Sequence, residues 1–358
     1  MDESVIDASA LALGFDRWDR REPLDGGQGR TCVVRKHRRS YVLKSYEATG
    51  WGARGIRERA ALTALDGAAG APRVLAEGGD PPYVVMTHLE GTGSLADSLL
   101  GADPRRAGDH LLRWAEALAA LHTAGTPGTR AAFRAALAER SPDLSPHALP
   151  GDFEAAADRY VVLLEELGLP AHDAALDELR ALPSRLDDPH HEVLSPADTC
   201  PDNNLLGAGS MRLIDFEHAE LRHAAWDVAY LRAPWPSCWC AWRLPDQLAE
   251  AALQRYCEAR GDRIAPDGFL DDVELATLGW RILTPAWFIR GALDTDDRDL
   301  APRRPSRRAF VLHRLAQVRD GDGPAALLAL ADDLHTGLSK RWGTVELELA
   351  PAFRTGST

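Results

Sequence analysis

Residues 195–206 read SPADTCPDNNLL, and residues 213–217 read LIDFE. The first stretch carries Asp198 and Asn203 five residues apart on either side of a proline, so both side chains can point into one cleft. The second stretch places Asp215 twelve residues after Asn203. Two carboxylates and one amide oxygen form an all-oxygen set, which suits the binding of Mg²⁺ and the orientation of a hydroxyl group. The two stretches therefore predict one shared site.

A hydrophobic hairpin is expected between these stretches. Leu205–Leu206 and Leu213–Ile214 flank GAGS at residues 207–210, which is typical of two short strands joined by a tight turn. Such a hairpin would carry Asp215 back beside Asp198. An aspartate and an asparagine at this spacing are common by chance, but their combination with the hairpin and with LIDFE is much rarer.

The combined pattern resembles the catalytic and metal loops of the aminoglycoside phosphotransferase family, which includes choline and homoserine kinases and shares the protein-kinase fold. The resemblance covers most of residues 20–230. It implies transfer of a phosphoryl group from ATP (or GTP), with Mg²⁺, to a hydroxyl of a small molecule. The acceptor could be an aminoglycoside, a nucleoside, another natural product or a metabolite, because antibiotic-resistance kinases and metabolic kinases of this fold share the quoted motifs.

The resemblance also assigns roles to single residues. Asp198 is expected to be the catalytic aspartate, which positions or deprotonates the acceptor hydroxyl, and Asn203 and Asp215 are expected to hold Mg²⁺. One position departs from the family, which usually has a histidine where this chain has Pro196. That histidine braces the metal loop, so its loss leaves open a catalytically degenerate, nucleotide-binding pseudokinase.

Asp227 lies in the sequence WDVAY, which resembles the segment that opens the next helix in the family. The resemblance implies that this aspartate ties down the backbone of the catalytic loop. An ordinary acidic residue at a helix N-terminus accounts for Asp227 almost equally well.

The nucleotide is expected to bind near a glycine-rich segment, LDGGQGR at residues 24–30. Gly26, Gly27 and Gly29 would let backbone N–H groups close over the phosphates. A glycine-rich hairpin turn without a ligand is at least as common.

Lys44 follows in YVLK, where the alternation of a strand places Val42 and Lys44 on the same face. A charged residue on an inward face needs a partner, and Glu58 on the next predicted helix is the expected one, with Glu47 as a rival. This pair matches the lysine and glutamate of kinase folds, in which the lysine holds the α- and β-phosphates. An edge-strand lysine that faces water is the alternative.

The segment YVVMTHLEG at residues 83–91 resembles the last strand of the small lobe as it enters the interlobe hinge. The backbone around Thr87 and Leu89 is therefore expected to bind the nucleotide base.

The pattern of apolar residues along the chain changes near residue 91. Before it lie short β-branched runs with one interrupting helix, and after it the apolar residues follow helical spacing. The expected strands cover residues 31–35, 41–46, 71–75 and 83–87, and the expected helices cover residues 55–65, 111–121, 153–167 and 324–338. The order predicts an α+β, protein-kinase-like bilobal fold, with a small β-rich lobe at 1–90 and a large, mainly helical lobe at 91–358.

Other features of the helical lobe have two readings. Trp235, Trp239 and Trp242 could form a wall for the acceptor or belong to the helical core. An acidic run that begins at Asp294 could receive an amine or be a solvated loop. The chain has five cysteines at irregular spacing, and the pair in Cys238-Trp-Cys240 has no further ligand at metal spacing in the sequence, so packed free thiols are expected.

The charge and composition of the chain limit the kinds of molecule that it is expected to bind. The net charge of −13 disfavours binding to nucleic acid or to anionic lipid, although it would tolerate a cationic substrate. No apolar run approaches the roughly 20 residues of a membrane span, and the acidic N-terminus lacks the features of a signal peptide, so a cytoplasmic protein is expected. It is expected to be a monomer or a homodimer.

A protein kinase is disfavoured because the next helix follows Asp215 too closely for a long activation segment. An interaction module that uses the tryptophans remains a further alternative.

Overall fold

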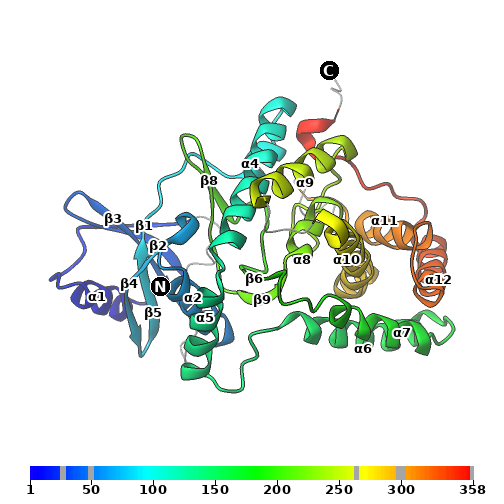
Figure 1. The fold of residues 1–358 in the computed structure, drawn as a ribbon, viewed down its shortest axis with the longest axis horizontal. Coiled ribbons are helices and arrows are strands. Elements are labelled where there is room, and N and C mark those ends of the chain that lie inside the picture. The colour runs from blue at the N-terminus through cyan, green and yellow to red at the C-terminus, as the bar shows by residue number, and fades with distance from the viewer. Residues whose placement is uncertain (25–29, 47–51, 262–265, 296–303, 355–358) are drawn as a thin grey trace.

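The computed structural model describes residues 1–24, 30–46, 52–261, 266–295 and 304–354. The expected glycine-rich loop with Gly26, Gly27 and Gly29 lies outside these residues, as do Glu47 and most of the acidic run after Asp294. The chain forms a small lobe built on one antiparallel sheet and a larger, mostly helical lobe (Figure 1). The predicted α+β, kinase-like architecture is confirmed.

The sheet of the small lobe has five antiparallel strands in the order β1-β2-β3-β5-β4. The strands are β1 (Arg20–Pro23), β2 (Thr31–Lys36), β3 (Arg39–Ser45), β4 (Val74–Gly79) and β5 (Pro82–Thr87). Three of the four predicted strands agree closely with β2, β3 and β5. The strand predicted at residues 71–75 begins later, at Val74, after a proline that cannot donate a ladder hydrogen bond.

Two helices cover the two faces of this sheet. Helix α1 (Glu3–Ala12) packs against the face that carries Tyr41 and Leu43, whereas helix α2 (Gly52–Leu65) packs on the opposite side. The alternation along β3 therefore places Lys44 on the α2 side, as the sequence predicts. The prediction of a single helix in this lobe was wrong, because the structure also contains helix α1.

The helical lobe is assembled from pairs of packed helices. Helix α4 packs on α9, α10 packs on α6 and α11, and α11 packs on α12. The α-helices are α3 (Leu95–Leu99), α4 (Pro104–Ala124), α5 (Pro127–Arg140), α6 (Leu149–Leu167), α7 (Asp173–Ala181), α8 (Ala225–Val228), α9 (Asp246–Arg260), α10 (Pro266–Asp294), α11 (Arg307–Arg319) and α12 (Ala325–Trp342). The predicted helices are confirmed, and Gly168 ends α6 with a φ of 65°.

Two small β-ladders position the predicted site. Strand β6 (Glu192–Ser195) pairs with β9 (Glu220–His223), and the predicted hairpin forms from β7 (Asn204–Leu206) and β8 (Met211–Leu213). Because the β7–β8 register pairs the first residue of β7 with the last of β8, the loop that ends in Asn203 lies beside the loop that begins at Ile214. The N–H of Ile214 donates to the carbonyl of Asn203 at 3.0 Å.

The lobes are also joined outside the connection between β5 and α3. Helix α5 packs on α2, and the guanidinium of Arg57 on α2 donates to the carbonyls of Ala219 and Ser145 at 2.9 and 2.7 Å. Within the described part of the chain, every helix is too short or too polar to cross a bilayer.

Candidate active site

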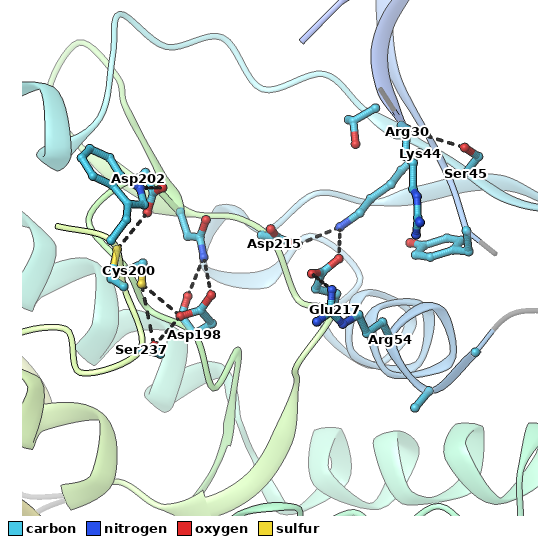
Figure 2. A pocket seen from close by; sticks show the side chains of 17 residues that line it. Arg30, Lys44, Ser45, Arg54, Asp198, Cys200, Asp202, Asp215, Glu217 and Ser237 are labelled. Carbon is cyan, nitrogen blue, oxygen red and sulfur yellow. Dashed lines mark hydrogen bonds and ion pairs between the residues drawn. The ribbon is translucent and has the colours of Figure 1, made fainter. Parts of the chain in front are cut away.

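A cavity of about 590 Å³ lies between the sheet of the small lobe and the loops after β6 and β8. Four of the residues predicted from the sequence line it together, namely Lys44, Asp198, Asn203 and Asp215. The rest of its lining comes from Arg30, Thr31, Ser45, Tyr46, Gly52, Ala53, Arg54, Cys200, Asp202, Glu217, Ser237, Cys238 and Trp239. Lys44 and Asp198 lie on opposite sides of the cavity with Asp215 between them (Figure 2).

Lys44 is the centre of a cluster of charged side chains. Its Nζ lies 2.8 Å from Glu58 Oε2, 2.8 Å from Asp215 Oδ1 and 3.0 Å from Glu217 Oε2. The Tyr46 hydroxyl donates to the buried carboxylate of Glu58 at 2.6 Å and holds it in place. The ion pair predicted between Lys44 and Glu58 is therefore formed, and two carboxylates from the loop after β8 join it.

The charges in this cluster do not balance. Burial lowers the pKa of the Lys44 ammonium, but Glu58, Asp215 and Glu217 outweigh burial and raise that pKa well above its ordinary value. Burial raises the pKa of Glu58, and the charge of Lys44 opposes this shift. The three carboxylates have oxygens within 4.8 Å of one another around the Lys44 ammonium, and Arg54 adds a second cation at 3.4 Å from Glu217, so three negative groups face two positive ones. The excess negative charge favours an additional cation at this place.

Three donors fix the orientation of the Asp198 carboxylate. The Ser237 hydroxyl and the Cys200 thiol each donate to Oδ1 at 3.0 Å, and Asn203 Nδ2 donates to Oδ2 at 3.3 Å. Asn203 Nδ2 also donates to the backbone carbonyl of Asp198 at 2.8 Å. The carboxylate is thus held at the cavity surface, where a hydroxyl group could reach it.

A buried network holds the loop that carries Asp198. The carboxylate of Asp227 is fully buried and accepts hydrogen bonds from Ser195 Oγ at 2.9 Å, from His122 Nε2 at 2.8 Å and from the guanidinium of Arg222. Ser195 Oγ in turn accepts the N–H of Ala197 at 2.9 Å. Asp227 therefore reaches the loop backbone through one intervening side chain.

The backbone of this loop adopts an uncommon conformation. Ala197 has a φ of 61°, which a residue with a Cβ adopts at a cost, and the Tyr230 hydroxyl donates to its carbonyl at 3.3 Å. Pro196 is buried beside it. The loop is thus braced by Ser195 and Tyr230.

The sequence of the chain is similar to that of a known protein family. A family model described as the phosphotransferase enzyme family (APH) matches residues 20–267. The chain belongs to this phosphotransferase family. No curated protein sequence matches it.

Solved structures agree with the assignment at the level of the fold. The choline/ethanolamine kinase family protein from Mesorhizobium loti is 16% identical, with a TM-score of 0.54 over 92% of this chain and 98% of that one. The choline kinase LicA from Streptococcus pneumoniae is 13% identical, with a TM-score of 0.51 over 94% and 99%. The APH(2″)-IIa chain of a gentamicin complex is 14% identical, with a TM-score of 0.53 over 92% and 98%. At such low identity these matches show the shared kinase-like fold alone.

The donor atoms of this phosphotransferase fit a hard divalent cation. Asn203 uses Nδ2 for both of its side-chain hydrogen bonds within the described residues, so its amide oxygen remains for a metal ion. Asp215 gives Oδ1 to Lys44 and keeps a second oxygen, and Glu217 adds a further carboxylate. Mg²⁺ prefers such oxygen ligands, and the excess negative charge around Lys44 supplies the electrostatic attraction.

Sequence reasoning missed two basic residues of the cavity. Arg30 is the last residue of the glycine-rich segment and directly precedes β2, and Arg54 lies in the first turn of α2, where its Nη1 is 3.4 Å from Glu217 Oε1. Together with Lys44 they give one side of the cavity three cationic side chains. The position of Arg30 beside the glycines is a signal that the sequence offered, whereas nothing in the sequence singled out Arg54.

The predicted hinge residues stand apart from this cavity. Neither Thr87 nor Leu89 is among the residues that line it. The N–H of Thr87 donates to the carbonyl of Arg73 at 2.9 Å, so that group is used within the sheet. A role for Thr87 and Leu89 in binding the base remains a prediction.

The tryptophans separate into two groups. Trp235 and Trp242 are buried in the helical core, whereas Trp239 lines the cavity and donates its indole N–H to Asp202 Oδ2 at 2.7 Å. Burial raises the pKa of Asp202 to about 6, and the neighbouring Cys238 acts in the same direction. Of the two alternatives that the sequence left open, the helical core thus holds for Trp235 and Trp242, and Trp239 alone of the three faces the cavity.

Proposed function

We propose that the protein transfers the γ-phosphoryl group of ATP, with Mg²⁺, to a hydroxyl group of a small molecule. The observation that carries this proposal is the single cavity in which Lys44, Asp198, Asn203 and Asp215 meet. Membership of the phosphotransferase family supports the use of ATP. A small acceptor is favoured because the cavity, of about 590 Å³, is lined by side chains from both lobes.

Each residue would have a separate task. Lys44, fixed by Glu58, would bind the α- and β-phosphates, and Arg30 and Arg54 would add positive charge beside them. Mg²⁺, when bound by Asn203 and Asp215, would neutralise charge on the transferred phosphoryl group. Asp198 would accept a hydrogen bond from the acceptor hydroxyl and align its oxygen for in-line attack. Positioning and electrostatic stabilisation would then supply most of the rate.

The acceptor would bind on the side of the cavity that holds Asp198, Ser237 and Trp239. This side is distant from the basic residues, and Asp198 and Asp202 make it acidic. An indole face and nearby carboxylates are suited to an amine-bearing acceptor. We therefore place hydroxylated amines first among the candidate acceptors, ahead of nucleosides and neutral natural products.

A phosphate-transfer screen tests the proposed function. The purified protein is incubated with Mg²⁺ and γ-labelled ATP or GTP against a panel of hydroxylated amines, nucleosides and natural products. The proposal expects at least one phosphorylated product whose formation requires Mg²⁺ and Asp198. If the protein binds Mg-ATP but neither transfers nor hydrolyses its phosphate, the pseudokinase alternative would replace the proposal.

Replacing Lys44 with alanine is expected to weaken Mg-ATP binding by about 10–100-fold, because a charge-assisted hydrogen bond to phosphate contributes about 1.5–3 kcal/mol. Isothermal calorimetry measures the change. Lys340→Ala, at an exposed position on α12, is the matched control and should bind Mg-ATP like the wild type. Unchanged affinity in Lys44→Ala would remove Lys44 from the nucleotide site.

Replacing Trp239 with alanine is expected to raise the KM for the acceptor by about 10-fold, since loss of one aromatic contact to a cation costs on the order of 1–2 kcal/mol. The KM for ATP should stay within about twofold. Trp342→Ala, at the end of α12, is the control for loss of a tryptophan outside the cavity. An increase confined to the KM for ATP would place the acceptor elsewhere.

A further inference from the structure

Two cysteines, Cys200 and Cys238, line the acceptor side of the cavity, and Cys240 packs directly behind Cys238. Cys200 follows Asp198 in the catalytic loop, whereas Cys238 and Cys240 lie in the segment between β9 and α9. The Sγ atoms of Cys238 and Cys240 are 3.0 Å apart. Ligand atoms of Cys200, Cys238 and Asp202 all lie within 4.8 Å of one another. The sequence showed only the Cys238–Cys240 pair, and the fold supplies the missing partners.

These thiols are buried and belong to no disulfide. Cys200, Cys238 and Cys240 are 3%, 4% and 1% exposed, and all are free. The carboxylate of Asp202 closes the cluster on the cavity side, where Oδ1 lies 3.7 Å from Cys238 Sγ (Figure 2). The remaining two cysteines lie elsewhere, Cys32 on β2 and Cys257 on α9.

The chemistry of the cluster differs from that of the catalytic metal site. Asn203, Asp215 and Glu217 offer only oxygen, which selects Mg²⁺. Cys200, Cys238 and Asp202 already have ligand atoms close together, and Cys240 beside Cys238 offers a fourth; three sulfurs with one carboxylate are the ligand types that select a soft or borderline cation. Metal ions bind cysteine as the thiolate, so each thiol of the cluster would release its proton on binding.

We propose that Cys200, Cys238, Cys240 and Asp202 form a site for one thiolate-binding divalent cation of the Zn²⁺ class. Bonds of about 2.3 Å to zinc place tetrahedral sulfurs about 3.8 Å apart, so Cys238 and Cys240 need to separate by less than about 1 Å. Binding displaces the thiol protons, including the one that Cys200 donates to Asp198, so Asp198 would then be oriented by Ser237 and Asn203. The ion joins the catalytic loop to the segment that carries Ser237 and Trp239. The ion would thereby fix the wall on the acceptor side.

A second cluster in the fold lacks this capacity. His191, His223 and Asp272 also have ligand atoms within 4.8 Å of one another. However, the N–H of Ala225 donates to His223 Nδ1 at 3.2 Å, which places the ring proton on Nε2, the atom that faces Asp272. That nitrogen then has no lone pair for a metal. The thiol cluster is not restricted in this way.

Metal titration of the whole chain tests the site without any need for activity. The protein is reduced, freed of metal with a chelator, and titrated anaerobically with Co²⁺ and then Zn²⁺ in the presence of excess Mg²⁺. The proposal expects one Co²⁺ per chain with a thiolate-to-cobalt charge-transfer band, displacement of that band by Zn²⁺, and release of protons. Excess Mg²⁺ should not remove the band, because it occupies only the oxygen site.

Single substitutions identify the ligands. Cys238→Ser and Cys240→Ser should each weaken Co²⁺ binding by about 100-fold or more, beyond the 10–100-fold expected for loss of an outer supporting group. Cys257→Ser is the matched control and should bind like the wild type. Circular dichroism without metal shows whether each variant is folded, and the wild-type spectrum stands independently of the variants.

Three outcomes would overturn the proposal. The first is a Co²⁺ spectrum without a thiolate band, which would place the ion on oxygen ligands. The second is equal loss of binding in Cys257→Ser. The third is mass-spectrometric detection of a Cys238–Cys240 disulfide that resists reduction, since disulfide sulfurs cannot serve as thiolate ligands.

Discussion

Asp198→Ala is expected to lower kcat by about 10²–10⁴-fold or more, the usual contribution of a positioned acid or base. The affinity for Mg-ATP should stay within about twofold, because Asp198 lies across the cavity from Lys44 and accepts its hydrogen bonds from Asn203, Ser237 and Cys200. Single-turnover kinetics with the acceptor found in the screen measure the first quantity, and calorimetry measures the second.

A second substitution at this position separates two roles of the carboxylate. Asp198→Asn keeps the shape and can still accept a hydrogen bond from the acceptor hydroxyl, but it cannot take the proton. Recovery of most of the rate would show that Asp198 mainly positions the hydroxyl. Asp158→Ala, at an exposed ion pair with Arg180, is the matched control and should leave kcat unchanged. Transfer near the wild-type rate by Asp198→Ala would mean that the catalytic loop has been misassigned.

Asp215 offers a contrast within the same site. Because Asp215 contacts Lys44 at 2.8 Å and keeps an oxygen for a metal ion, its loss should impair nucleotide binding and turnover together. Asp198 should affect turnover alone. The difference between the two aspartates follows from their positions, because Asp215 contacts Lys44 whereas Asp198 lies on the far side of the cavity from it.

Local sequence patterns predicted the parts of the fold and the site that are determined by residues close together in the chain. The turn sequence after Leu206 fixes the β7–β8 hairpin, and alternation in β3 fixes the side on which Lys44 lies. Both facts follow from backbone periodicity, so neither required knowledge of the tertiary structure. The pairing of Lys44 with Glu58 could also be expected, since a buried charge needs a partner.

Tertiary contacts between distant segments could not be predicted in the same way. Cys200 and Cys238 are separated by 38 positions in the sequence. The hydrogen bond from Ser237 to Asp198 joins two residues that are similarly far apart in the sequence. No local pattern indicates that these segments meet. Helix α1 was missed for a different reason, because its charged first turn was read only as evidence against a signal peptide, although Asp2 accepts from the N–H of Ser4 as an N-cap.

The role of Asp227 shows why a local reading was ambiguous. From the sequence, Asp227 could have been a solvent-exposed residue at a helix start. In the fold, it is fully buried and accepts from Arg222, His122 and Ser195. Burial raises its pKa, but the charge of Arg222 and the hydrogen bond from His122 outweigh burial and hold the pKa of Asp227 well below its ordinary value. Its carboxylate is therefore ionised inside the core.

Asp227→Ala is accordingly expected to destabilise the protein by about 3–5 kcal/mol, the cost of leaving a buried charge without its partner. The guanidinium of Arg222 would keep its ion pair with Glu220 and its contact with the Trp280 ring, and His122 would lose its acceptor while still paired with Tyr256. Urea unfolding at neutral pH measures the loss. Asp158→Ala, an aspartate in an exposed ion pair, should change the free energy of unfolding by less than about 0.5 kcal/mol.

The pH dependence of the free energy of unfolding tests whether Asp227 is ionised in the folded protein. A carboxylate whose pKa is lower in the folded than in the unfolded state stabilises the fold above the unfolded pKa, and this stabilisation is lost as the pH falls. The difference in stability between wild type and Asp227→Asn should therefore be constant near neutrality. Below about pH 4 it should shrink by roughly 1.4 kcal/mol for each pH unit. A difference that grows on acidification would contradict an ionised Asp227.

Ser195→Ala distinguishes support of the core from support of the catalytic loop. This change leaves the Asp227–Arg222 pair intact but removes the link from Asp227 through Ser195 Oγ to the N–H of Ala197. The stability loss should be near 1 kcal/mol, that of a single hydrogen bond. If the link positions Asp198, kcat should nevertheless fall while Mg-ATP affinity is kept. If kcat is unaffected, Asp227 stabilises the core only, and the positive φ of Ala197 must be maintained by Tyr230 and by the packing of Pro196.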